Sequence, residues 1–390
     1  MLNEILGLLA VASIRDYACG MIARPLIVLL AHASLLLAQG GEAKPKQAPG
    51  QELNVAVGLG GGAGGRFGAR STGARACKHH AQIQAGLNWL ATAQSENGSW
   101  IVEGSPDVTM AVTSLAMLAM LGDGNSMRMG AHKEQLKRGV KWLREQQRPD
   151  GSFAGSAGPH LLATLAMTEC YLLSNYSLLK SNCTKALDHA RKLRHADGGW
   201  RASLTEPDSD PALTLWGATV LGTAEFAGLL AKEESAAITG WLQGPRASML
   251  PERGILGVNV SAIRAASLAG DQLSANVFTR LWLKMPASAA DIKAVKRAAK
   301  QARNWPTKGV GDLNLHEWFC SCYALFQAGQ PQAVDRIIAA TAKAQVVAGT
   351  DQGSWAPVGI WGKAGGRPWT TAMAVLILET PYRYTKLVRR

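Results

Sequence analysis

The chain has 390 residues, a formal net charge of +13 at pH 7, 47% hydrophobic residues and 18% charged residues. These fractions are ordinary for a soluble globular protein. No apolar stretch offers the ~20 residues that a membrane-spanning helix needs, and no nucleic-acid-binding module is recognisable. We therefore expect neither a membrane-spanning protein nor a nucleic-acid partner.

Residues 1–38 are predicted to be a signal segment for export to the periplasm or beyond. A basic start at Met21–Arg24 precedes an apolar run through Ala38, which is typical of a secretory signal and makes Met21 a candidate translation start. Residues 39–78 are rich in glycine and proline and are predicted to be a disordered linker. The folded domain is expected at 79–385, followed by a basic tail at 386–390.

One motif recurs four times and predicts a repeat architecture. We expect its glutamine to bond the carbonyls that end a helix, its glycine to allow a left-handed turn, and its aromatic residue to cover that turn. A tryptophan five residues before the glutamine, Trp89 or Trp142, is expected to pack inward. The motif residues are Gln94, Gly98 and Trp100, Gln147, Gly151 and Phe153, Gly198 and Trp200, and Gly353 and Trp355.

Two kinds of helix alternate along the domain. Residues 132–147 place apolar side chains on one face only, as a surface helix does. Residues 107–121, 160–173, 211–223 and 370–378 are apolar nearly all round, which is typical of a helix buried on every side. The alternation predicts an all-α fold: an α/α toroid of about six helical hairpins, with an outer amphipathic layer and an inner apolar layer.

The inner helices carry polar residues near their starts. Asp107 and Asp210 are predicted to be N-caps, whose carboxylates accept hydrogen bonds from free backbone amides. The threonines that follow either face a partly hydrated cavity or bond back to their own backbone. These threonines are Thr109, Thr113, Thr214 and Thr370.

The repeats resemble those of squalene and hopene cyclases and of protein prenyltransferase β-subunits, over roughly residues 80–385. The segment from Gly353-Ser-Trp355 to Tyr384 resembles the end of exported bacterial proteins known as prenyltransferase or squalene-oxidase repeat proteins. The resemblance implies a single toroid of the terpenoid cyclase and protein prenyltransferase superfamily. It implies no particular reaction, because one fold supports many functions.

An acidic segment gives the first candidate for chemistry. Glu206-Pro-Asp208-Ser-Asp210-Pro-Ala212 resembles the Asp-x-Asp-Asp-Thr-Ala motif of squalene-hopene cyclases. The resemblance implies that Asp210 is the proton donor and Asp208 its support, since a carboxyl group in an apolar cavity has a raised pKa. Pro211 stands where that motif has its third aspartate, and helix capping is the alternative role for Asp210.

A second candidate is a metal site. Cys320-Ser-Cys322-Tyr resembles the zinc-binding segment of prenyltransferase β-subunits, with Cys320 in the place of an aspartate. His316 precedes Cys320 by one helical turn. The later helix has no histidine where that family has one, so the ligand set is incomplete. We expect no stoichiometric zinc and no other cofactor.

Two functions stay open. The first is a binding toroid that holds an apolar molecule such as an isoprenoid, a glycan or a protein partner in its cavity or on its rim. An anionic surface could also meet its basic side, on which Lys293, Lys296, Lys300 and Arg303 gather. The alternative is a cyclase-like or prenyl-transferring enzyme that uses Asp210 as its acid. A disulfide between Cys170 and Cys183 is likewise open.

Overall fold

Helices account for almost all regular structure in the described residues. A computed structural model describes residues 73–230, 255–257, 265–301, 305 and 313–383, all within one unit, Glu52–Arg390. Within these ranges the only strand-like features are two isolated bridges at Trp200. The helices are α4 (His80–Ala93), α5 (Pro106–Gly122), α6 (Lys133–Gln146), α7 (Ala157–Ser174), the 3-10 helix η1 (Ser177–Leu179), α8 (Lys180–Lys192), α9 (Pro211–Phe226), α11 (Ala265–Trp282), α12 (Ala289–Gln301), α13 (Leu315–Gln327), α14 (Pro331–Lys343) and α15 (Gly359–Arg383).

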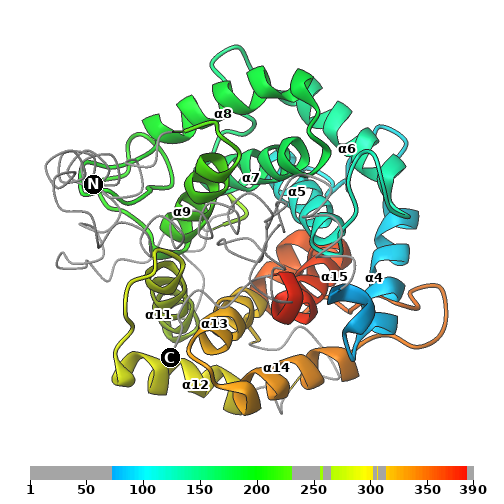
Figure 1. Cartoon of the computed structure of the whole chain (residues 1–390), viewed down its shortest axis with the longest axis vertical. Coiled ribbons are helices and arrows are strands. Elements are labelled where there is room, and N and C mark those ends of the chain that lie inside the picture. The colour runs from blue at the N-terminus through cyan, green and yellow to red at the C-terminus, as the bar shows by residue number, and fades with distance from the viewer. Residues whose placement is uncertain (1–72, 231–254, 258–264, 302–304, 306–312, 384–390) are drawn as a thin grey trace, which may run out of the picture. The chain divides into compact units, whose positions relative to one another are not determined.

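The helices of this unit form two layers (Figure 1). The inner helices α5, α7, α9, α11, α13 and α15 pack in that order, and α15 packs against α5, so the inner layer closes on itself. Helices α4, α6, α8, α12 and α14 lie outside them. The prediction of an α/α toroid is confirmed.

Burial explains which helix lies in which layer. Every residue of α5 from Val108 to Gly122 is buried, whereas α6 buries five residues on one face. A helix that is apolar all round must have neighbours on every side, and an amphipathic helix needs only one. No helix of the described ranges combines the length and hydropathy that crossing a bilayer requires.

The motif glycines are turns pressed against the next outer helix. Gly98, Gly151, Gly198 and Gly353 have φ between 88° and 96°, which confirms the predicted left-handed turn. A Cβ atom on the first, second or fourth of them would also collide with a backbone carbonyl of a neighbouring outer helix. The carbonyls belong to Arg138 of α6, Lys185 of α8 and Ala85 of α4.

The motif glutamine joins two repeats, and the prediction that it caps its own helix is wrong. The Gln94 amide nitrogen donates to the carbonyl of Gly98 at 2.8 Å and to the carbonyl of Gln135 in α6 at 3.0 Å. Gln147 makes the same pair of bonds, to Gly151 and to Asn182 of α8. The side chain therefore fixes its own turn and the next outer helix at once.

The motif aromatics tie the two layers together. The Trp100 indole donates to the carbonyl of Leu90 in α4 at 2.8 Å, and its backbone N–H donates to the hydroxyl of Thr113 in α5 at 3.0 Å. Equivalent bonds are made at Trp200 and Trp355, where the inner-helix acceptors are Thr214 and Thr371. Thr113 and Thr214 therefore take neither of the two predicted roles.

The other two predicted threonines, Thr109 and Thr370, also bond backbone groups. Thr109 bonds the backbone of Val102, whereas the Thr370 hydroxyl donates to the carbonyl of Gly366 in its own helix. Bonding to the helix's own backbone is thus confirmed for Thr370 alone. Most of these threonines hold the loops that precede the inner helices.

In the second repeat a histidine replaces the threonine acceptor. The Phe153 backbone N–H donates to Nδ1 of His160 at 3.2 Å, and Nε2 of His160 lies 3.1 Å from the carbonyl of Ala186. These contacts require the neutral ring with its proton on Nε2. Burial, and then the charge of His189, lowers the pKa of His160 to about 3, which keeps the ring neutral.

A glutamine hydrogen bond of the kind that links neighbouring repeats also joins the last repeat to the first. The Gln345 amide donates to the carbonyl of Gln82 in α4 at 2.8 Å, across 263 residues of sequence, and to Gly353 of its own turn. The predicted signal segment, the linker up to residue 72 and the tail fall outside the described residues. Residues 73–76 form a helical turn beside Tyr382.

Candidate functional site

Asp210 is a helix cap at the start of α9. Its Oδ1 accepts from the Leu213 backbone N–H at 2.8 Å, and its own N–H donates to the carbonyl of Trp200 at 2.8 Å. The side chain is 5% exposed. The predicted N-cap is confirmed, and no hydrogen bond joins Asp208 to Asp210 within the described chain.

Replacing Asp210 by asparagine is expected to change the free energy of unfolding by less than about 1 kcal/mol, because asparagine caps a helix nearly as well as aspartate. The acid is removed completely. Denaturant unfolding of the two proteins measures the difference. Asp210→Ala, which removes the cap, should destabilise the protein more. A cyclic triterpene made from squalene by the wild type and not by Asp210→Asn would show that Asp210 is also a catalytic acid.

Asp107 is not an N-cap, contrary to the prediction. Helix α5 begins one residue earlier, with Ser105 at the cap position. The Asp107 carboxylate instead accepts from the Gly155 backbone N–H at 3.1 Å and from the Ser156 hydroxyl at 2.6 Å. It therefore holds the loop before α7 against the start of α5.

His316 and Cys320 lie close together, whereas Cys322 faces α15. The Trp216 indole donates to Nε2 of His316 at 3.2 Å, which occupies the lone pair that a metal would need. Cys320 Sγ lies 3.8 Å from the same nitrogen. Burial raises the pKa of the Cys322 thiol to about 12, and this thiol bonds Thr380 of α15. In the described ranges no three His, Cys, Asp or Glu residues gather as a metal site would require.

No disulfide joins Cys170 to Cys183. Cys170 on α7 and Cys183 on α8 are free thiols and completely buried in this structure. Burial raises the pKa of both thiols, to about 12 for Cys183.

Aromatic side chains fill the space between α9, α11 and α13. Trp216 stacks on Phe319 with ring centroids 5.7 Å apart, and Phe278 stacks on Tyr323 at 3.7 Å. All four are 3% exposed or less. Rings that stack on one another are core packing, so this part of the ring offers no free aromatic face to a ligand.

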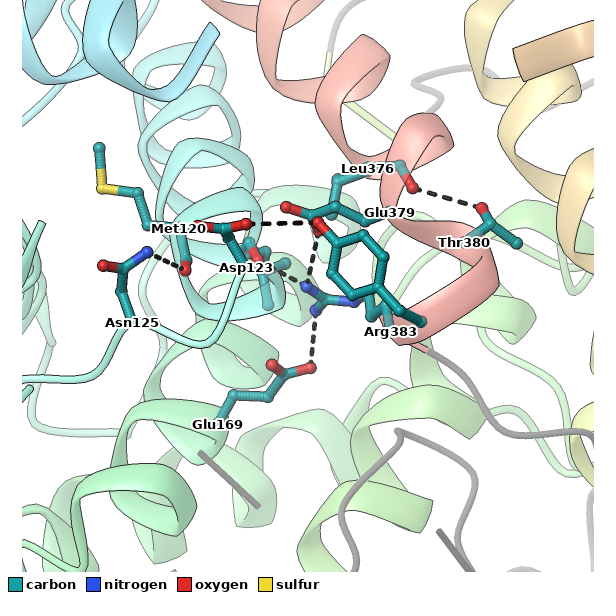
Figure 2. Close-up of polar contacts among 10 residues, drawn as sticks. Met120, Asp123, Asn125, Glu169, Leu376, Glu379, Thr380 and Arg383 are labelled. Carbon is teal, nitrogen blue, oxygen red and sulfur yellow. Dashed lines mark hydrogen bonds and ion pairs between the residues drawn. The ribbon is translucent and has the colours of Figure 1, made fainter. Parts of the chain in front are cut away.

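A buried ionic cluster at the carboxyl ends of α7 and α15 was missed by sequence reasoning (Figure 2). Arg383 pairs with Glu169 at 2.9 Å and with Glu379 at 3.4 Å, and it also donates to the carbonyl of Leu118 in α5 at 2.6 Å. The three charged side chains are at most 2% exposed. The sequence signal is a glutamate inside a helix that is otherwise apolar.

Asp123 extends the polar contacts to the outer layer. It accepts from the Gln84 amide of α4 at 2.8 Å, and the Tyr382 hydroxyl lies 3.4 Å away. Burial raises the pKa of Asp123, and burial also raises the pKa of Tyr382 well above its ordinary value. The cluster joins α4, α5, α7 and α15 and is structural in character.

An open groove lies at the end of the ring where α5 begins. It is bounded by the first motif turn, by the loop that leads into α5 and by the last turn of α6, and has a volume of about 470 Å3. We call it the Trp142 groove. Its lining includes Asn97, Glu103, Asp107, Trp142, Gln146 and Arg148.

The Trp142 groove combines an aromatic ring with amides and charges. Trp142 is 8% exposed, so it packs inward as predicted, yet its remaining surface lines the groove. The side chains of Glu103, Gln146 and Arg148 are exposed and make no hydrogen bond within the described chain. These groups can therefore bond a ligand without breaking an internal contact.

The comparisons support the fold and no single family. No family description and no curated protein matches the chain. Among solved structures, an inactive variant of an α-1,6-mannanase of Salegentibacter sp., in complex with α-1,6-mannotriose, is 10% identical with a TM-score of 0.52 and covers 78% of this chain and 99% of that one. An α-amylase from Clostridium perfringens is 11% identical with a TM-score of 0.50, over 77% of this chain and 98% of that one.

A type II terpene cyclase from Scytonema is also similar. It is 14% identical with a TM-score of 0.47 and covers 78% of this chain and 98% of that one. The likenesses to the mannanase and the amylase show the fold alone, and function must be argued from the site.

Proposed function

We propose that this protein is a glycan-binding toroid and that the Trp142 groove holds the glycan. The observation that carries the proposal is the make-up of that groove. A pyranose presents C–H groups on its faces and hydroxyls at its edges, and the negative face of an aromatic ring attracts polarised C–H groups. Gln146, Glu103 and Arg148 supply donors and acceptors for the hydroxyls.

The groove is large enough for a sugar, and the packing between α9, α11 and α13 argues against an isoprenoid there. The groove volume of about 470 Å3 falls in the usual range for small-molecule sites, ~300–1,000 Å3. The aromatic side chains between α9, α11 and α13 stack on one another, and the carboxylate of Asp210 caps α9. The mannanase with the same architecture was solved with a mannotriose, which adds support for a glycan.

Calorimetric titration with α-1,6-mannotriose, and with maltotriose as a second neutral probe, tests the proposal. We expect saturable binding of at least one of them. Trp142→Ala should weaken that binding by about tenfold or more, the equivalent of ~1.4 kcal/mol. Because Trp142 is largely buried, Gln146→Ala serves as a second variant at an exposed position and should weaken binding with an unchanged melting temperature.

Leu178→Ala is the matched control, since this side chain is 63% exposed and lies outside the groove. It should bind as the wild type does. Absence of binding to both sugars, or equal affinity in the wild type and both groove variants, would overturn the proposal. Shortened oligosaccharides in the incubated sample would show that the groove also cleaves its ligand.

A further inference from the structure

A second groove lies against α4, on the other side of the first motif turn. It is formed by one face of α4 and by the turn that ends in Gly353, and it has a volume of about 510 Å3. Figure 1 shows the segment between α14 and α15 beside α4. We call it the Trp89 groove. The lining residues that matter here are Asn88, Trp89, Thr92, Thr350 and Gln352.

The two grooves share a tryptophan and a turn residue at equivalent places in successive repeats. Gly98 is pressed against the carbonyl of Arg138, and Trp142 follows Arg138 by four residues in α6. Gly353 is pressed against the carbonyl of Ala85, and Trp89 follows Ala85 by four residues in α4. Four residues are about one helical turn, so each tryptophan stands beside the turn of the preceding repeat.

The third position in this series carries different residues. Gly151 is pressed against the carbonyl of Lys185, and the residue four positions on is His189, which replaces the tryptophan. Its Nδ1 lies 3.5 Å from the Asp150 carboxylate, where the other two turns carry Asn97 and Gln352. At this position a histidine ring and a carboxylate lie side by side, where the other two positions have a tryptophan and an amide.

The chemistry of the Trp89 groove fits a neutral, hydroxyl-rich ligand. None of its lining side chains is charged. Trp89 is partly exposed, whereas the turn tryptophans Trp100, Trp200 and Trp355 are fully buried. The indole N–H of Trp89 and the side-chain amides of Asn88 and Gln352 form no hydrogen bond within the described chain, which leaves them available to a ligand.

We infer that the Trp89 groove is a second glycan site, for a neutral oligosaccharide that stacks on Trp89 and bonds the surrounding amides and threonine hydroxyls. This inference rests on the proposed function for its ligand class. It goes beyond that function because it assigns two sites per chain to repeat-equivalent positions. Trp89 packs against the core as predicted, and its remaining surface is exposed in the groove.

Calorimetric titration of the full chain with α-1,6-mannotriose counts the sites. We expect two sites per chain in the wild type, one in Trp89→Ala, one in Trp142→Ala and none in the double variant. Gln352→Ala, at an exposed position, should weaken the second site by about tenfold and leave the melting temperature unchanged. Val347→Ala, in the same segment and 80% exposed, is the control and should keep both sites.

The outcomes separate this inference from the proposed function. A single site that is lost in Trp142→Ala and unchanged in Trp89→Ala overturns the second site and leaves the proposed function standing. A single site that is lost only in Trp89→Ala supports the second site and overturns the assignment of the Trp142 groove. Absence of binding of both α-1,6-mannotriose and maltotriose, in every form of the protein, overturns both.

Discussion

Replacing Trp100 by alanine is expected to lower the free energy of unfolding by roughly 3–5 kcal/mol, the usual cost of truncating a fully buried tryptophan. Its side chain is 0% exposed and joins the two layers through the Leu90 carbonyl. The variant loses this bond and leaves a cavity in the core. Urea unfolding, followed by the far-ultraviolet circular dichroism of the helices, measures the change.

Ile101→Ala is the control for this experiment. Ile101 is the next residue in the chain and is 53% exposed, so its truncation should cost far less. Equal losses in the two variants would show that the motif tryptophan does not hold the layers together. Trp200→Ala and Trp355→Ala should behave as Trp100→Ala does, because all three make the same pair of bonds.

The second large effect is expected at the buried ionic cluster. Arg383→Met should destabilise the protein by roughly 3–5 kcal/mol, because it leaves buried carboxylates without their counter-charge. Arg383 contacts Glu169, Glu379 and the carbonyl of Leu118 at once. The loss therefore falls on α5, α7 and α15 together, and the shift in the urea midpoint measures it.

A rescue experiment shows whether charge is the cause. Adding Glu169→Gln and Glu379→Gln to Arg383→Met removes the uncompensated charges and should restore part of the lost stability. Arg367→Met is the control, since its pair with Asp351 is partly exposed and should contribute about 1 kcal/mol or less. A triple variant less stable than Arg383→Met would contradict this explanation.

The layers and the turns of this fold could be predicted from the sequence because both depend on short-range patterns. The apolar surface of residues 107–121 and the one-sided pattern of residues 132–147 are visible in any window of about four turns. A glycine at a fixed place after a helix requires only local backbone geometry. The prediction that Asp210 caps α9 succeeded for the same reason.

The predictions that failed depended on neighbours far away in the sequence. The second acceptor of Gln94 is 41 residues distant, and that of Gln345 is 263 residues distant, so the helix end seemed the nearest partner. Asp107 bonds residues 48 and 49 positions later. The Trp89 groove also joins two ends of the domain, and no reading of a single repeat would place them side by side.

The hydrogen bond from Gln345 to Gln82 joins the last repeat to the first. The repeats therefore form a closed ring and not a linear array with two ends. In an open array of repeats the first and last units have one neighbour each and need special capping surfaces. Here each of the six inner helices has an inner neighbour on both sides. Among the described helices no terminal repeat is left at which unfolding could begin, so opening any one hairpin must break two interfaces at once.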